Sequence, residues 1–171
     1  MTTTILPQQL DRFIPLPKAA RRLKISEKTL RSLVDTGKIR AAVLATGQII
    51  VSEQNAEQVA TYEQINEQLR AIRREDYKRL QGQLITIAEA VERYGIPGMT
   101  VRGWVKRNQV AVIDRGHGMK LDEADVAYCA TVYSVRKSTG SLSGAPLLDE
   151  EGRPNLLKHP ELSEYRRRKK T

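Results

Sequence analysis

A repeat of about 71 residues constrains the fold of this 171-residue chain more than any other feature. Residues 14–39 align without a gap onto residues 85–110, and most apolar positions stay apolar. Seven aligned pairs are identical: Ile14/Ile85, Ala19/Ala90, Arg22/Arg93, Ile25/Ile96, Thr29/Thr100, Arg31/Arg102 and Val34/Val105. A period this long indicates a duplicated small domain rather than one unit of a solenoid.

The start of each repeat predicts a pair of helices. In the second repeat, Thr86 is expected to cap a first helix that Gly95 ends. Pro97 and Gly98 are expected to start a second helix. Trp104 falls on the apolar stripe of that helix, so we predict that it lies in the core rather than stacking on a base.

After the helix pair, each repeat predicts a two-stranded wing and a third helix. The strands are expected at residues 43–45 and 49–51, and at residues 110–113 and 119–121. In the first repeat, Ser26 is the expected N-cap of the second helix, and in the second repeat Asp122 is the expected N-cap of the third. The predicted fold is therefore mainly α with small β wings.

Positive charge is concentrated on the helix pairs. The chain has a net charge of +9. Residues 14–40 hold eight Lys and Arg against two acidic residues, whereas residues 41–66 hold no basic residue and three acidic ones. Such a distribution favours a polyanion as the partner of the helix pair.

The two repeats resemble the winged helix-turn-helix of the MerR and phage excisionase superfamily. The segments that carry the resemblance are PLPKAARRLKISEKTLRSLVDTGKI, TIAEAVERYGIPGMTVRGWVKRNQV and LDEADV. They cover roughly two thirds of the chain. The resemblance implies two tandem winged helix-turn-helix domains. The second repeat departs from the pattern, because it has Pro97-Gly98 where Ser and a polar residue are usual, and Asn108-Gln109 in place of Gly-Lys.

Carried over position by position, the resemblance places Thr29, Arg31, Thr100 and Arg102 on recognition helices that enter the DNA major groove. The wing tips, at residues 46–48 and 115–120, would touch the DNA backbone or the minor groove. The full set of expected DNA contacts is Lys28, Thr29, Arg31, Ser32, Lys38, Arg40, Gln48, Met99, Thr100, Arg102, Lys106, Arg107, Arg115, His117 and Lys120.

The segment between the repeats predicts one long helix. Residues 55–81 contain no Pro or Gly, and Val59, Tyr62, Ile65, Leu69 and Ile72 recur at helical spacing. Its expected length of roughly 40 Å is close to the ~34 Å between equivalent major-groove faces one turn apart, so we expect two DNA sites at about that spacing. The apolar stripe must be covered by the repeats or by a second chain in a homodimer.

The expected division of the chain is a first repeat at 12–60, a helical connector at 61–82, a second repeat at 83–133 and a disordered basic tail at 134–171. The run Arg166, Arg167, Arg168, Lys169 and Lys170 is expected to add non-specific phosphate contacts. Leu147, Leu148, Leu156 and Leu157 form a weak candidate for docking a protein partner.

The leading functional hypothesis is a non-enzymatic, sequence-specific double-stranded DNA-binding protein, a transcriptional regulator of bacterial or phage type. One alternative is an excisionase-like architectural factor for recombination, transposition or partition, and another is a protein-interaction adaptor. Single-strand binding is disfavoured because the aromatic residues are not interleaved with the basic ones.

No enzymatic function and no cofactor are expected, because the chain has no Walker-type loop, nucleophile elbow or metal-ligand spacing. Two histidines and the single cysteine, Cys129, are scattered along the sequence. We expect Cys129 to be a buried core residue. The absence of a disulfide framework and of a long apolar run favours a cytoplasmic, nucleoid-associated protein without a membrane segment.

Overall fold

The computed structural model describes residues 12–116, 118–138 and 146–158. The chain divides into two compact units, and the division falls after Gln64. Unit 1 contains the described residues 12–64 and Lys158, and unit 2 contains those between Ile65 and Leu157.

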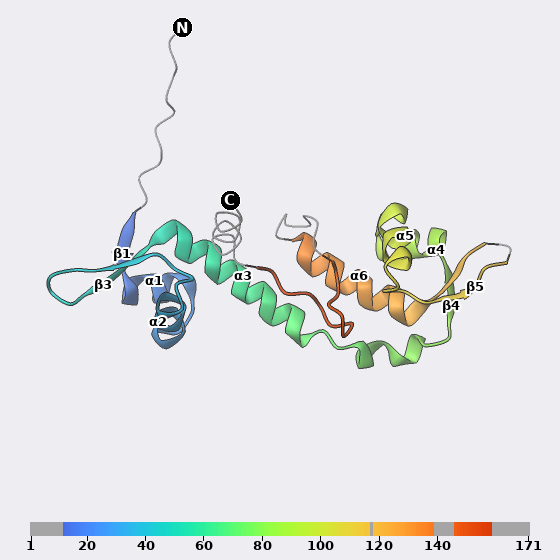
Figure 1. The fold of residues 1–171 in the computed structure, drawn as a ribbon, viewed down its shortest axis with the longest axis horizontal. Coiled ribbons are helices and arrows are strands. Elements are labelled where there is room, and N and C mark those ends of the chain that lie inside the picture. Colours follow the sequence, from blue (N-terminus) through green and yellow to red (C-terminus); the bar gives the residue numbers. More distant parts are fainter. Residues whose placement is uncertain (1–11, 117, 139–145, 159–171) are drawn as a thin grey trace, which may run out of the picture. The chain divides into compact units, whose positions relative to one another are not determined.

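The described residues form a mainly helical fold with small β-sheets, as the sequence predicts, but each antiparallel sheet has three strands rather than two (Figure 1). The first half of the chain contains β1 (Phe13–Pro15), α1 (Leu16–Leu23), α2 (Glu27–Asp35), β2 (Ala41–Val43), β3 (Ile49–Ser52) and α3 (Glu53–Ala71). The second half contains the 3-10 helix η1 (Arg74–Leu80), β4 (Leu84–Thr86), α4 (Ile87–Tyr94), α5 (Gly98–Lys106), β5 (Val112–Asp114), β6 (Lys120–Asp122) and α6 (Glu123–Lys137).

The repeat in the sequence is also a repeat in the structure. Both halves have the order strand, helix, helix, strand, strand, helix, and the sheets have the orders β1-β3-β2 and β4-β6-β5. The strand registers correspond, because Ile14 pairs with Val51 in one sheet and Ile85 pairs with Leu121 in the other. All four side chains are buried. The aligned apolar positions therefore build equivalent cores.

The predicted helix caps are confirmed. The Ser26 hydroxyl accepts a hydrogen bond from the Thr29 amide at 3.0 Å at the start of α2. At the start of α4, Thr86 and Glu89 form a reciprocal capping box, in which each side chain accepts from the other residue's amide. Gly95 ends α4 with a φ of 65°, a left-handed conformation that glycine adopts at little cost.

The predicted wing strands exist, but their bounds differ by up to two residues. The strand expected at 43–45 is β2 at Ala41–Val43, and that expected at 110–113 is β5 at Val112–Asp114. In the first wing, the Leu44 amide donates to the Gln48 carbonyl at 2.9 Å, and the Gly47 amide donates to the Leu44 carbonyl at 2.8 Å. The turn thus starts at Leu44, because these two bonds close the hairpin earlier than the apolar pattern indicated.

The predictions for Trp104 and Cys129 are confirmed. Trp104 is 2 % exposed, and its ring meets that of Tyr133 edge to face at a centroid distance of 5.9 Å. Cys129 is fully buried, and this burial raises the pKa of its thiol to about 12. A thiol that stays protonated in the core is a packing residue rather than a nucleophile.

The prediction of one helix from 55 to 81 is wrong. α3 ends at Ala71, and η1 begins at Arg74 after an extended Arg73. Tertiary contacts favour this break: the Tyr77 hydroxyl lies 2.7 Å from the Thr131 hydroxyl, and the Tyr77 ring packs edge to face on Tyr128. With 19 residues, α3 is about 28 Å long, so the predicted match to one turn of DNA no longer follows from its length.

The apolar stripe of the connector is covered within the single chain. Val59, Ile65 and Leu69 are buried, and Tyr62 and Ile72 are partly buried. A homodimer was expected only if a second chain were needed to cover this stripe. Because the chain covers the stripe itself, the stripe gives no reason to expect a homodimer.

The prediction of a disordered tail from Ser134 is wrong for residues 134–137, which extend α6, and for residues 146–157, which pack in unit 2. Leu147, Leu148 and Leu157 are buried, and so they are not an exposed docking motif. Burial of these leucines in unit 2 removes apolar surface from water, which stabilises the packed segment. The composition of the tail did not indicate this burial. The Arg136 guanidinium also donates to the Pro146 carbonyl at 2.8 Å.

Asn66 joins residues 146–157 to α3 through two hydrogen bonds. Its side-chain amide donates to the Leu157 carbonyl at 3.2 Å, and its side-chain oxygen accepts from the Leu157 amide at 2.8 Å. Asn66→Ala should lower the free energy of unfolding by about 1–3 kcal/mol, because buried backbone groups lose their partners. Amide hydrogen exchange at Leu157 should also accelerate. Gln68→Ala, on the exposed side of α3, is the control, and unchanged exchange in Asn66→Ala would show that the segment is held by other contacts.

Candidate nucleic-acid interface

In unit 1, helix α2 buries one face and exposes the other. Leu30 and Leu33 point into the core, at 0 % and 7 % exposure. With 3.6 residues per turn, the opposite side of the helix faces solvent. The predicted contact residues Lys28, Thr29, Arg31 and Ser32 are all exposed, and so are Glu27 and Asp35 at the two ends of the helix. The fold thus gathers two basic and two hydroxyl side chains on one surface of a nine-residue helix.

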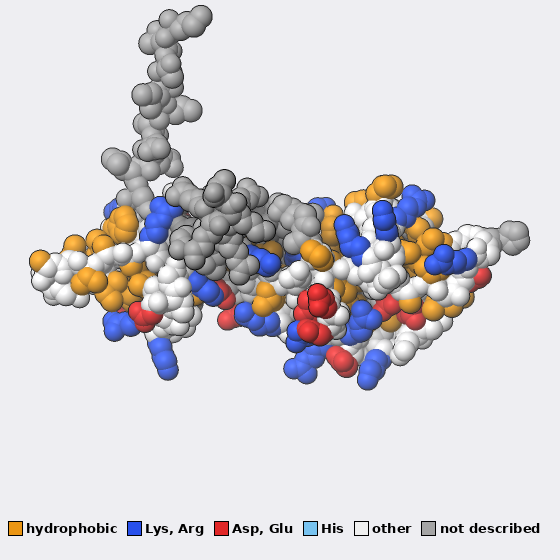
Figure 2. Space-filling view, in the orientation of Figure 1, with side chains coloured by type: hydrophobic (Ala, Val, Ile, Leu, Met, Phe, Trp, Pro, Cys, Tyr) orange, Lys and Arg blue, Asp and Glu red, His pale blue; other side chains and the backbone are white. Residues whose placement is uncertain are grey.

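In unit 2, helix α5 has the same construction. Val101 and Trp104 are buried. The exposed predicted residues of this helix are Met99, Arg102 and Lys106; Thr100 is partly buried, and Arg107 is exposed at the C-terminal cap. In Figure 2, several Lys and Arg side chains lie on the surface where α5 lies, among hydrophobic and other side chains.

Several positions that match between the repeats hold the fold. Arg22 pairs with Glu53 and, at 2.7 Å, with Glu57. Arg93 pairs with Glu123 in the equivalent place. These ion pairs join the first helix of each repeat to its third helix. The identity Arg22/Arg93 is therefore explained by the fold.

Glu123 also accepts a hydrogen bond from the Tyr94 hydroxyl at 2.8 Å. Burial, reinforced by this bond to a carboxylate, raises the pKa of Tyr94 to about 12. The Arg93 guanidinium donates to the same carboxylate oxygen, Oε1. The three side chains contact one another within the unit, so this cluster serves the fold.

Asn55 and Asp125 are each the third residue of the last helix of their repeat, and each attaches the wing to that helix. The Asn55 side-chain oxygen accepts from the Arg40 amide at 2.8 Å. Asp125 accepts from the Ala111 amide at 2.9 Å and pairs with Arg74 at 2.8 Å. The start of each wing is therefore held in the same position relative to its helix pair.

The identical pair Arg31/Arg102 forms no structural ion pair of this kind. Arg31 and Arg102 are exposed on α2 and α5. Within the described part of the chain, Arg31 has no hydrogen-bond or ion-pair partner, and Arg102 contacts only the Met99 sulfur, at 3.9 Å. Thr29 differs from both, because its hydroxyl lies 2.7 Å from the Ser26 hydroxyl and forms part of the cap.

The remaining predicted contact residues differ from one another in exposure and in their partners. Lys38 is partly buried and pairs with Glu63 at 2.9 Å, so it serves the packing of α3. Arg40, Gln48 and Arg115 are exposed, and Lys120 is partly buried in β6. His117 and the run Arg166, Arg167, Arg168, Lys169 and Lys170 lie outside the described residues.

The two wings differ in chemistry. The hairpin at residues 41–48 carries no charge, and it exposes Val43 at 70 % and Leu44 at 42 %. The hairpin of unit 2 carries Asp114, Arg115 and Lys120. Only the second wing thus has the basic side chains that phosphate contacts need.

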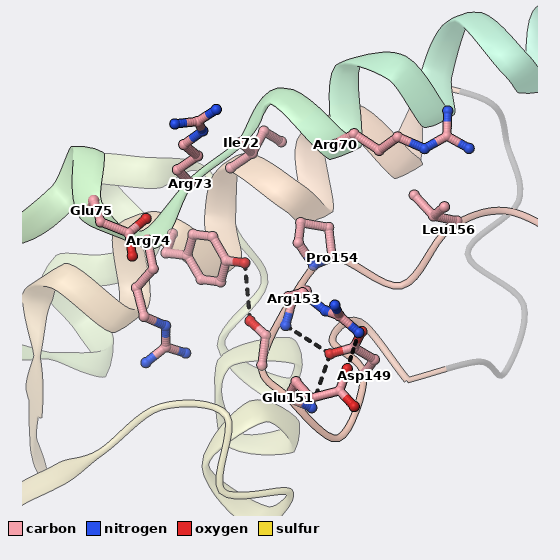
Figure 3. A pocket seen from close by; sticks show the side chains of 12 residues that line it. Arg70, Ile72, Arg73, Arg74, Glu75, Asp149, Glu151, Arg153, Pro154 and Leu156 are labelled. Carbon is pink, nitrogen blue, oxygen red and sulfur yellow. Dashed lines mark hydrogen bonds and ion pairs between the residues drawn. The ribbon is translucent and has the colours of Figure 1, made fainter.

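Sequence reasoning missed two exposed arginines, Arg70 and Arg73, at the end of α3 and just beyond it. They line a pocket of about 670 Å³ within unit 2. The other lining residues include Arg74, Tyr128 and Arg153 (Figure 3). The available signal was the spacing of Arg70, Arg73 and Arg74 at i, i+3 and i+4, which places the three side chains on one face of a helix.

The polar groups of this pocket do not converge on a common point. The guanidinium groups of Arg70, Arg73 and Arg74 point in different directions (Figure 3). Arg153 is paired with Asp149, whose carboxylate also accepts from the Arg153 amide at 2.8 Å. A ligand site needs a few convergent polar groups, so the pocket is the weaker candidate.

No family model, curated protein or solved structure matches the chain. Among the described residues, no helix is both long and apolar enough to span a membrane. Within the same ranges, no group of three or more His, Cys, Asp or Glu side chains is placed to hold a metal ion. The case for a function therefore depends on the two helix surfaces.

Proposed function

We propose that the chain is a non-enzymatic, sequence-specific double-stranded DNA-binding protein built from two winged helix-turn-helix units. In this proposal α2 and α5 are the recognition helices. One observation carries the proposal: Arg31 and Arg102 are identical in the two repeats and exposed, yet they contribute no ion pair to the fold. The other identical pairs are buried or partly buried apolar residues, the structural ion-pair arginines, and Thr29/Thr100, of which Thr29 belongs to the cap of α2 and Thr100 is partly buried.

The chemistry of the two helix surfaces suits duplex DNA. A short helix fits the major groove, where arginine forms two hydrogen bonds with the guanine edge. The neighbouring Lys28 and Lys106 supply charge for phosphate oxygens. A net charge of +9 on 171 residues favours association with a polyanion.

Two biological roles fit a sequence-specific DNA-binding protein of this kind. The resemblance to MerR-type and excisionase domains favours a transcriptional regulator of bacterial or phage type. The duplication favours the second role, an architectural factor for recombination, transposition or partition, because two readers in one chain can engage two sites at once. Cooperative binding with DNA bending would distinguish this role from binding at a single operator.

Selection of bound duplexes from a random pool tests the proposal. We expect an enriched motif, and we expect the affinity of the selected duplexes to fall steeply as salt rises, because phosphate contacts release counterions. Binding without an enriched motif would favour the architectural role. Absence of binding to any duplex would contradict the proposal and favour a protein-interaction adaptor, for which the uncharged first wing is the available surface.

A further inference from the structure

The first turn of α5 differs in chemistry from that of α2. In α2 the sequence is Ser26-Glu27-Lys28, and Ser26 caps the helix. In α5 the aligned residues are Pro97-Gly98-Met99, and no side chain caps the helix. The first turn of α5 is therefore apolar, whereas that of α2 is polar. The first turn is the part of a recognition helix that meets DNA bases.

Met99 is exposed to a degree that the fold does not explain. It is 75 % exposed, more than any other large hydrophobic residue described. Its neighbour Gly98 lies over apolar side chains: a Cβ atom there would be 3.5 Å from Val91 and 3.6 Å from Ile87. Val91 itself is 38 % exposed. The apolar surface thus continues from α4 to the tip of α5.

A basic side chain lies beside this apolar one. The Arg102 Nη1 atom lies 3.9 Å from the Met99 sulfur, and Lys106 and Arg107 are exposed at the C-terminal end of the same helix. Helix α5 contains no acidic residue. The surroundings of Met99 therefore favour an anionic partner over an apolar protein surface.

We infer that Met99 recognises the 5-methyl group of a pyrimidine, in thymine or 5-methylcytosine, next to a guanine that Arg102 reads. This inference rests on the proposed DNA-binding function. The 5-methyl group is the apolar feature of the major-groove edge, and methionine is a flexible side chain that fits irregular apolar contacts.

The inference assigns different base preferences to the two units. At the aligned position, unit 1 has Lys28, whose ammonium group favours guanine or a phosphate and gains nothing from a methyl group. Methyl sensitivity should therefore belong to α5 alone. Exchange of the two side chains, by Met99→Lys and Lys28→Met, should remove it from one unit and introduce it in the other.

The experiment uses the full chain and a duplex selected by it from a random pool. Each thymine is replaced in turn by uracil, which removes only the 5-methyl group. We expect one thymine at which the replacement weakens binding about three- to fivefold, the loss expected for one buried methyl group. Cytosine at that position should bind as weakly as uracil, and 5-methylcytosine should restore the affinity.

Met99→Ala tests whether Met99 is the residue that recognises the methyl group. In this variant, thymine and uracil duplexes should bind equally well, whereas Leu84→Ala, which truncates an exposed apolar side chain of β4, should discriminate as the parent does. Unchanged circular dichroism and melting would show that Met99→Ala is folded. If the parent binds its selected duplex but ignores every uracil replacement, the inference about Met99 is overturned while DNA binding stands. If the parent selects no duplex, the proposed function fails as well.

Discussion

Trp104→Ala should lower the free energy of unfolding of unit 2 by about 3–5 kcal/mol. The side chain is 2 % exposed and among the largest that are fully buried, so its removal leaves a cavity that a small unit has little capacity to fill. The edge-to-face contact with Tyr133 is lost with it. A loss of this size is a large fraction of the stability of a typical domain.

The measurement is urea unfolding followed by far-ultraviolet circular dichroism, because Trp104 is the only tryptophan and its fluorescence disappears in the variant. Hydrogen exchange at the amides of unit 1 provides an internal reference. Met99→Ala is the matched control, since truncation of an exposed side chain on the same helix should change stability by less than about 0.5 kcal/mol. Parent-like unfolding of Trp104→Ala would contradict the core assignment.

Arg31→Ala and Arg102→Ala should each reduce specific DNA affinity by about 1–3 kcal/mol, which corresponds to between about five- and 150-fold. Neither side chain forms an ion pair with the described residues, so the fold should stay intact. Arg→Lys at either position keeps the charge but loses the two-pronged guanidinium, and it should recover only part of the affinity.

Binding is measured by titration of a selected duplex and of a scrambled one at fixed salt. The base preference at one motif position should relax in each variant, which separates reading of bases from general charge. Arg153→Ala removes the same charge from a turn of unit 2 and should leave specificity unchanged. Equal affinity of parent, Arg31→Ala and Arg102→Ala for the selected duplex would rule out α2 and α5 as recognition helices.

The exposed faces of α2 and α5 could be predicted from the sequence because helical periodicity is a local property. The spacing of Leu30 and Leu33 determines which residues of α2 point outward, and no distant contact is needed. Lys38 shows the limit of this reasoning. It belongs to the basic cluster in sequence, but Glu63, which pairs with it, lies 25 residues later.

The sequence by itself determined the duplication, because the two repeats can be aligned directly. It also determined the helix pair, the two wing strands and the third helix of each repeat, the helix caps and the buried Trp104, because each of these depends on residues a few positions apart. The tertiary structure alone decided the end of α3 at Ala71 and the packing of residues 146–157. Both depend on partners far along the chain: Tyr77 meets Thr131, and Asn66 holds Leu157. Contacts at that separation leave no periodic signal, so only the folded chain reveals them.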